Sequence, residues 1–363
     1  MRIFIRFVQI LTFSIHIALS FQEPADTSRP EAQGILPIPI AYYTPETGFA
    51  GGAGALYFAR PENSLTHVRP SATALLLIYT QKKQFISQFS GEWYFQEAAH
   101  RLDTDILFMR YPQKFFGIGN KTPENLEEGY TSQILRFEIK GLTTVAKSFQ
   151  AGLTLYFEDR KLSDISPTGL LGTGTILGSA NGTTAGVGPL AYFDTRDNIF
   201  APTRGSYYQL SIAVHNKSFG SDYQFSKTVI NLREYFSVGD DEVLALQWYG
   251  YFIGGSAPFH KLAELGGQNQ MRGYFEGRYR DKNYITSQVE FRIPLFWRIG
   301  FVAFAGMGDV AGDISQFNLR DIKASYGFGF RYFFNIKERL NLRLDFGFGN
   351  GSSGMYIGPQ ESF

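Results

Sequence analysis

Polar and apolar residues alternate one by one through many short runs of this chain, and its last residue is the aromatic Phe363. A period of two places successive side chains on opposite faces of a β-strand. The clearest runs are Ser132–Lys140, Ile285–Ile293, Ile322–Phe334 and Arg339–Phe348. The chain is therefore expected to be all-β, with one apolar and one polar face on each of these strands.

Such strands could form a soluble sandwich or a membrane barrel, because both structures bury one face of each strand. The 21 Tyr and 35 Phe favour the barrel, since membrane barrels carry girdles of aromatic residues at both interfaces. The mean hydropathy of −0.14 excludes a bundle of membrane-spanning helices. A bilayer then leaves a closed barrel as the spanning structure. We predict a transmembrane antiparallel β-barrel.

The strands number about sixteen, and each approaches the ~9–11 residues that a tilted spanning strand needs. The first is expected at Leu36–Tyr43 and the last at Gly354–Phe363. The short links are Gln96–Arg101, Gly239–Glu242, Pro294–Arg298 and Asn335–Arg339, and the long ones are Phe115–Gly129, Lys161–Gly182, Gly254–Asn283 and Asp309–Asp321. Outer-membrane barrels have short periplasmic turns and long extracellular loops. Both termini are therefore expected on the periplasmic side, with Phe363 as an interfacial aromatic in the last strand.

The first 20 residues have the features of a secretory signal peptide, because Arg2 and Arg6 precede an apolar stretch that ends in small residues. This stretch is shorter than the ~20 residues that span a bilayer, so cleavage is favoured over an anchor. We expect residues 21–35 to be a short periplasmic segment and residues 36–363 to form the barrel. Without Arg2 and Arg6 the chain holds 34 − 2 = 32 basic and 33 acidic residues, and nothing points to nucleic acid as a partner.

Three stretches carry a resemblance to a known family. The first is Tyr192-Phe-Asp-Thr-Arg-Asp-Asn198 with Pro202-Thr-Arg-Gly205, and the second is Leu265-Gly-Gly267 with Met271-Arg-Gly-Tyr274. The third is Gln288-Val-Glu-Phe-Arg-Ile-Pro-Leu295 with Phe304-Ala-Gly-Met-Gly308, Leu342-Arg-Leu-Asp-Phe346 and the terminal Phe363. In this order and at these spacings they resemble the BamA/TamA superfamily of outer-membrane assembly barrels, also called bacterial surface antigens. The resemblance covers most of Leu36–Phe363. It implies an integral protein of the outer membrane of a Gram-negative bacterium.

The second stretch resembles the motif of a family loop that folds back into the barrel, which assigns Arg272, Gly273 and Tyr274 to that motif. An arginine stays charged at any working pH and needs a carboxylate partner when it is enclosed. By analogy with the family, Glu290 on the polar face of the next strand is the expected partner. The family usually offers a further Asp one strand on, where this chain has Gly306, with Asp309 three residues later. This departure leaves the anchoring of the loop open.

The first stretch is similar to a periplasmic turn of the family, and we expect it to serve folding rather than chemistry. Asp194 and Arg196 of this stretch can form an ion pair, and Asp197, Asn198 and Gly205 supply turn conformations. Pro202 completes the signature.

Prolines remove donors from a strand ladder. The pairing of the first and last strands should therefore be short and able to open at Pro37, Pro39 and Pro359. Tyr356 and Phe363 are expected to form the C-terminal signal for assembly of the barrel itself.

Family members that thread substrates usually carry periplasmic POTRA domains, and the residues before Leu36 are too few for one. The chain therefore resembles a short form without POTRA domains, so capture of substrates by those domains cannot be carried over. Three functions remain open. They are assistance to the insertion or translocation of outer-membrane proteins, a gated or passive pore, and a non-transporting scaffold subunit.

An enzyme is not expected, because no nucleophile motif or pair of catalytic carboxylates stands out. The chain has no Cys, and its histidines show no spacing for a metal site; they are His16, His67, His100, His215 and His260. We expect neither a metal nor another cofactor, and we expect His260 to be solvated in its long loop. The partners implied are outer-membrane lipids, the machinery that inserts the barrel, and other outer-membrane or periplasmic proteins.

Overall fold

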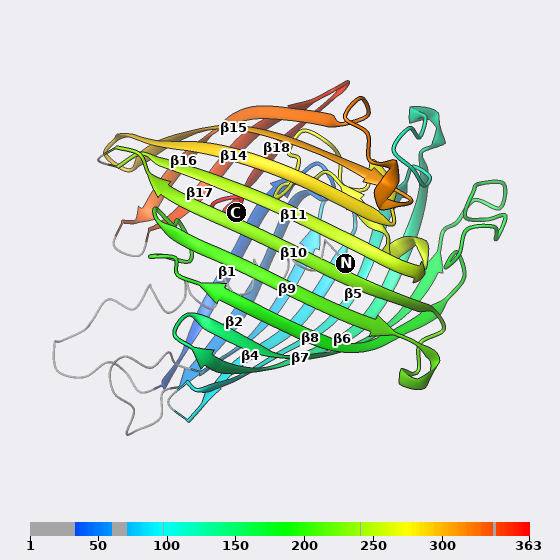
Figure 1. Ribbon diagram of the computed structural model, residues 1–363, viewed down its shortest axis with the longest axis horizontal. Helices are drawn as coiled ribbons and strands as arrows, with labels where there is room; N and C mark the ends of the chain where they lie inside the picture. Colours follow the sequence, from blue (N-terminus) through cyan, green and yellow to red (C-terminus); the bar gives the residue numbers. More distant parts are fainter. Residues whose placement is uncertain (1–32, 60–70, 97, 240, 337–338) are drawn as a thin grey trace.

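Sixteen antiparallel strands close into a barrel in the computed structural model, which describes residues 33–59, 71–96, 98–239, 241–336 and 339–363 (Figure 1). Each strand pairs with its neighbour in the sequence, except that β11 pairs directly with β14. The strands are β1 (Gln33–Thr44), β2 (Gly48–Ala59), β3 (Ser71–Thr80), β4 (Phe85–Phe95), β5 (His100–Phe115), β6 (Glu128–Ala146), β7 (Phe149–Ser163), β8 (Gly182–Asp194), β9 (Gly205–His215), β10 (Gln224–Ser237), β11 (Val243–Ser256), β14 (Asn283–Phe296), β15 (Ile299–Ala311), β16 (Lys323–Asn335), β17 (Leu340–Gly349) and β18 (Ser352–Pro359). The predicted fold class and strand number are confirmed.

Four short 3-10 turns and a small second sheet complete the structure. The turns are η1 (Glu124–Leu126), η2 (Lys217–Phe219), η3 (Phe259–Lys261) and η4 (Ile314–Gln316), and the small sheet pairs β12 (Ala263–Leu265) with β13 (Tyr279–Asp281). No helix in the described ranges is long and apolar enough to cross a membrane. The signal peptide expected at residues 1–20, the segment up to Ala32, and His16 and His67 lie outside the described residues.

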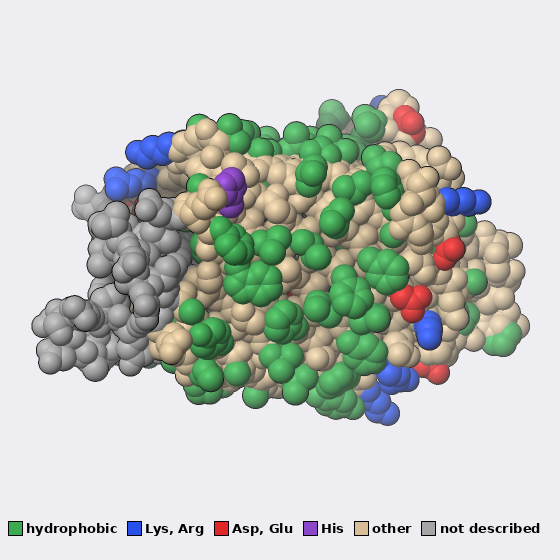
Figure 2. All heavy atoms as spheres, turned by 90° about the horizontal axis from the view of Figure 1, so that it is seen from below, with side chains coloured by type: hydrophobic (Ala, Val, Ile, Leu, Met, Phe, Trp, Pro, Cys, Tyr) green, Lys and Arg blue, Asp and Glu red, His purple; other side chains and the backbone are tan. Residues whose placement is uncertain are grey.

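The alternation in the sequence becomes an outer and an inner face of the barrel wall. On β16, Tyr326, Phe328 and Phe330 are exposed on the outside, whereas Ser325 and Arg331 are buried inside. Hydrophobic side chains cover the middle of the outer face, and charged ones gather near its two ends (Figure 2). This distribution matches a bilayer around the middle of the barrel and water at both ends.

The interior differs from the expected charged lining over one sector. The inward-facing buried side chains of β1–β3 are mostly apolar and include Ile38, Ile40, Leu56, Phe58, Leu76 and Ile78. The inner faces of β4 and β5 are mixed, because Ile86 and Leu107 lie beside the buried Gln88, Ser90 and Asp105. Charged inner faces begin at Asp105 and Arg136 and continue through β17. Both faces of β1–β3 are therefore mostly apolar, which removes there the alternation on which the expectation depended.

The links fall into two sets at opposite ends of the barrel, which we call the turn end and the loop end. Residues 147–148 and 297–298 are short links at the turn end, and residues 116–127, 164–181, 257–282 and 312–322 are long links at the loop end. The predicted sorting does not hold near the closure of the barrel. There the links at residues 45–47, 81–84 and 350–351 are short although they lie at the loop end.

The barrel closes between β1 and β18 at a seam of one residue pair, Tyr43 with Ile357. By comparison, β1 pairs with β2 along its whole length, from Gln33 opposite Ala59 to Thr44 opposite Gly48. The first and last strands are therefore joined by a single residue pair, and the part that Pro37, Pro39 and Pro359 play in this junction stays a prediction. β1 begins at Gln33, three residues before the expected start at Leu36.

Candidate functional site

The loop between β11 and β14, residues 257–282, folds into the barrel and is called the inward loop below. Its motif residues lie deep inside, with Arg272 fully buried and Tyr274 only 1% exposed. Aromatic side chains from the wall and the loop form one apolar cluster, to which Tyr274 itself belongs. The cluster also includes Phe115, Tyr130, Tyr249, Tyr251, Phe259 and Tyr284. Two other long loops cover this cluster, because Gly119 N–H donates to the Arg280 carbonyl (2.7 Å) and Phe259 N–H donates to the Leu177 carbonyl (2.8 Å).

Glycines allow the inward loop to lie against the barrel wall. Gly273 has φ +106°, a left-handed conformation that favours glycine. A Cβ on Gly347 of β17 would lie 2.7 Å from the main chain of Arg272, and one on Gly349 would lie 2.6 Å from the Tyr274 ring. The loop backbone therefore approaches β17 more closely than any side chain there would permit. Gly273 N–H also donates to the Tyr356 hydroxyl of β18 (3.0 Å).

The two terminal nitrogens of the Arg272 guanidinium contact two carboxylates of the barrel wall. Nη2 forms an ion pair with Glu290 of β14, and Nη1 lies 2.5 Å from Asp345 Oδ2 of β17. The guanidinium also lies over the Phe304 ring of β15, 3.5 Å from its centroid. Glu290 and Asp345 are themselves fully buried, so this arginine is held by two desolvated charges and an aromatic face.

Two further arginines and one further carboxylate extend this contact into a closed ring of charges. Arg292 Nη2 lies 2.9 Å from Glu290, and Arg331 Nη1 lies 2.6 Å from Asp345. Glu361, beyond the end of β18, joins them, since it lies 2.6 Å from Arg331 Nε and 3.8 Å from Arg292 Nε. The order around this ion ring is Arg272, Glu290, Arg292, Glu361, Arg331 and Asp345.

The structure thus brings Arg272 and Glu290 together and supplies a second carboxylate that sequence reasoning missed. Gly306 does not take part, and Asp309 instead pairs with Lys323 (2.9 Å). The second acid is Asp345, two strands farther along the barrel than expected. The alternation in Arg339–Phe348 already placed Asp345 on a polar face, but only the curvature of the closed wall shows that β17 faces the loop.

The sequence profile of the Omp85 superfamily domain matches residues 108–353 of the 363-residue chain, which is more than half of it. The chain belongs to the Omp85 superfamily. This superfamily includes the assembly barrels that the three sequence stretches resemble, and an Omp85 barrel of this kind is a protein of the bacterial outer membrane.

Solved structures share the Omp85 barrel fold. BamA from Haemophilus ducreyi lacking POTRA domains 1–3 matches with a TM-score of 0.65 and 14% identity over 92% of this chain and 71% of that chain. CdiB from Acinetobacter baumannii and CdiB from Escherichia coli match 92% of this chain with TM-scores of 0.57 and 0.56 and identities of 13% and 12%. The match spans 60% and 64% of those two chains. No curated protein sequence matches the chain.

The last residues of this Omp85 barrel contradict one prediction. Phe363 is not in the last strand and does not face the membrane interface, because β18 ends at Pro359 and the chain then turns into the lumen. Gln360 makes this turn with φ +66°. Phe363 is 4% exposed and packs against Tyr235 and Ala245. Tyr356 is likewise buried and faces the inward loop, so neither aromatic belongs to an interfacial girdle.

A second contradicted prediction concerns His260, which was expected to be solvated. It lies in η3 of the inward loop and is only 5% exposed. Burial, together with the nearby positive charges of Arg160 and Lys261, holds the pKa of His260 well below its ordinary value, so the ring is neutral at working pH. The adjacent Lys261 Nζ lies 2.7 Å from Glu158 of β7 and fixes this part of the loop to the opposite wall.

The turn between β8 and β9 in this Omp85 chain is held by its own side chains. Asp194 accepts two hydrogen bonds from the Arg196 side chain, at 2.9 and 2.6 Å, and one from the Arg196 backbone N–H, at 3.1 Å. Asp197 accepts from Thr203 N–H (2.9 Å) and from Arg339 of the neighbouring β16–β17 link (2.6 Å), and Asn198 accepts from the N–H groups of Phe200 and Ala201. Gly205 has φ +99°. These contacts give every polar member of the predicted signature a structural partner.

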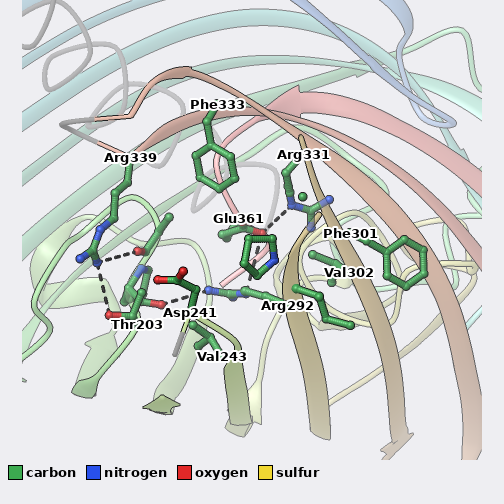
Figure 3. Close-up of a pocket in the computed structure, with 15 residues that line it drawn as sticks. Thr203, Asp241, Val243, Arg292, Phe301, Val302, Arg331, Phe333, Arg339 and Glu361 are labelled. Atoms are coloured by element: carbon green, nitrogen blue, oxygen red, sulfur yellow. Dashed lines mark hydrogen bonds and ion pairs between the residues drawn. The ribbon is translucent and has the colours of Figure 1, made fainter. Parts of the chain in front are cut away.

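A cavity opens at the turn end, beside the ion ring (Figure 3). The turn residues Pro202 and Thr203 form one side, Val302 and Phe333 form another, and Glu361 reaches into it from the end of the chain. Arg292 and Arg331 both point at Glu361 in this view. Arg292 Nη1 also donates to the Pro202 carbonyl (3.4 Å), which links the ring to the β8–β9 turn. Within the described residues, no cluster of three metal-binding side chains occurs.

Proposed function

We propose that this Omp85 barrel assists the insertion or translocation of other proteins at the outer membrane. The observation that carries the proposal is the seam, where a single pair, Tyr43 with Ile357, joins β1 to β18. Every other neighbouring pair of barrel strands shares seven or more residue pairs. Strand pairing holds a barrel closed, so this junction is the weakest place in the wall and the place where a client strand could enter.

The filled lumen supports a lateral route over an axial one. The inward loop and the two loops over it fill the loop end, and Glu361 to Phe363 fill part of the turn end. A client that moves between membrane and lumen through the seam would not need to displace the aromatic cluster. The proposal includes a periplasmic position for the turn end and removal of residues 1–20 on export.

Depletion of the protein followed by a census of the outer-membrane proteome tests the proposal. Because the chain has no Cys, a seam lock can be made with Tyr43→Cys and Ile357→Cys in one chain. We expect depletion to lower the amounts of particular outer-membrane proteins, and the oxidised double variant to fail to restore them. Each single variant is the matched control and should restore them. If the locked barrel restores all affected proteins, the seam route is wrong.

A gated pore is the second candidate, favoured by the charged inner faces from β5 to β17. Conductance in planar bilayers separates the two. A pore should conduct without any change at the seam, and the Tyr43–Ile357 lock should leave its conductance unchanged. Stable co-purification with a partner, with neither conductance nor effect on other barrels, would instead support a scaffold.

A further inference from the structure

The inward loop has a second attachment, made by η3 to the wall opposite the ion ring. Around the sixteen-stranded barrel, β7 lies eight strands from β17, which is half of the circumference. Lys261 Nζ lies 2.7 Å from Glu158 Oε1 of β7 and donates to the Tyr156 hydroxyl (2.6 Å), which in turn donates to Glu158 Oε2 (2.6 Å). The Tyr251 hydroxyl donates to the Lys261 carbonyl (2.8 Å). The wall therefore holds η3 by a side chain and by the backbone.

His260 lies within this attachment without a hydrogen bond of its own. The residue is 5% exposed, and neither ring nitrogen has a hydrogen-bond partner among the described residues. The ring packs roughly at right angles to the rings of Phe259 and Tyr223, with centroids 5.4 and 6.4 Å away. A phenyl ring would make the same packing contacts. What distinguishes a histidine at this position is its capacity to take up a proton near neutral pH.

A proton on His260 would enter a site that is already rich in positive charge. The ionisable side chains around η3 come from β6 (Tyr130, Arg136), β7 (Tyr156, Glu158, Arg160), β9 (His215), β10 and the link before it (Lys227, Tyr223), β11 (Tyr251), β12 (Glu264) and β13 (Arg280). Glu158 is the carboxylate that acts most strongly on His260, and it is already shared by Lys261 and Arg160 (2.7 and 3.0 Å). Glu264 is paired with Arg280. A protonated His260 would therefore be buried beside two cations and without a carboxylate of its own.

The proton balance makes docking of η3 less favourable in acid. Burial first, and then Arg160 and Lys261, hold the pKa of His260 well below its ordinary value of 6.5, which water would restore in a released η3. A group whose pKa falls on docking stabilises the docked state above the free value, and this contribution is lost as the pH falls below 6.5. Lys261 acts in the same direction at higher pH, because burial lowers its pKa from 10.5 to about 7.

We propose that η3 is an acid-released clasp of the inward loop, and that protonation of His260 frees η3 from β7 and loosens the aromatic cluster at the loop end. Arg272 does not take part, because an arginine keeps its charge at any working pH and stays between Glu290 and Asp345. In acid the inward loop therefore leaves one wall and remains docked on the other. This inference concerns the inward loop and holds whether or not the barrel inserts proteins.

A cysteine beside η3 reports its release, because the chain has none of its own. Ala257→Cys, at a residue that is 6% exposed, should be protected from a thiol reagent while η3 is docked. Ser218→Cys on the exposed η2 turn gives the reference rate at each pH and corrects for the pH dependence of the thiol reaction itself. In proteoliposomes the ratio of the labelling rates at 257 and 218 should rise about 30-fold from about pH 7.5 to about pH 5, since docking weakens about tenfold for each pH unit below 6.5.

His260→Phe keeps the packing and removes the titration, so it should abolish most of this rise. His100→Phe is the matched control, because His100 begins β5 at the turn end, away from η3, and its loss should leave the rise unchanged. His260→Gln, which does not titrate either, serves if His260→Phe fails to fold. A labelling ratio that does not change with pH in the parent, or that rises in the His260 variants as much as in His100→Phe, would overturn the clasp.

Discussion

Arg272 is the single residue on which the inward loop depends most. Its guanidinium reaches Glu290 and Asp345 at once, and all three side chains are fully buried. Arg272→Ala should lower the free energy of unfolding by about 3–5 kcal/mol, the cost of breaking a buried pair from one side. Arg272→Lys should recover only part of this, because an ammonium cannot reach two carboxylates with a planar fork.

Heat-dependent migration of the barrel on gels measures this loss of stability. Lys282→Ala, at the exposed end of the same loop, is the control and should migrate as the parent does. An Arg272→Ala barrel that resists heat as well as the parent would show that the buried charges have found other partners.

Asp197 gives the turn end a dependence on pH. Partial burial would raise the pKa of Asp197, but hydrogen bonds from Thr203, Arg339 and the backbone of Thr203 and Arg204 outweigh it and lower the pKa to about 2. A carboxyl whose pKa falls on folding stabilises the fold above its unfolded pKa of 3.8, and this contribution is lost as the pH falls towards 2. Asp197→Asn should therefore lower the melting temperature at pH 6 and have little effect at pH 2. A constant difference across this range would contradict the assignment.

Sequence reasoning could pair Arg272 with Glu290 because both lie in stretches with family resemblance. It could not find Arg331 and Glu361 as members of the same ring. Arg331 comes from β16 and Glu361 from beyond β18, and the resemblance had no motif there. Their contacts reach up to 361 − 292 = 69 positions along the chain, from Arg292 to Glu361, and depend on the closure of the wall, which no local pattern encodes.

At the scale of elements, the β8–β9 turn depends on the conformation of one glycine. Gly205 has φ +99°, and a Cβ there would run into the main chain of Thr195. Gly205→Val should cost about 1–3 kcal/mol or more and reduce the amount of folded barrel in the outer membrane. Gly141→Ala on β6 is the matched control, because a Cβ there meets nothing within 4 Å. Equal yields of the two variants would show that the turn adapts to a side chain.

The last strand is shorter in the structure than the sequence pattern predicted. The apolar and aromatic residues near the end of the sequence predicted a strand through Phe363, and the structure ends it at Pro359. After Pro359 the chain turns inward, where Asn341, Arg292 and Arg331 all contact Glu361. Expecting these contacts requires knowing which strands face each other across the lumen.

At the scale of the whole molecule, the lumen should not conduct freely. The inward loop is held by ion pairs of Arg272 and Lys261 with the wall, and the ion ring holds Glu361 at the turn end. We expect low conductance from the parent barrel in planar bilayers. Arg272→Ala combined with Glu361→Gln should increase it, because two of the charged contacts that hold these plugs are lost. Large steady conductance of the parent would instead favour the pore.

The architecture itself was largely predictable, since sixteen strands follow from counting alternating runs between turn signals. The sorting of links by length was less complete. It failed beside the seam, where residues 45–47 and 350–351 are tight turns at the loop end, and at the turn end, where residues 195–204 form a ten-residue link. The links next to the seam at the loop end are therefore short, whereas the long loops pack over the lumen.

The ion ring also implies an order of events during assembly. Its members come from the inward loop, from three strands and from the last residues of the sequence, so the ring cannot exist until the wall around it is in place. Phe363 packs against Tyr235 and Ala245, which oppose each other on β10 and β11, and Arg292 of β14 donates to its main-chain oxygen, so its full set of contacts needs all three strands. Burial of Phe363 should therefore accompany completion of the wall, and the accessibility of this residue to a protease should fall as the barrel closes.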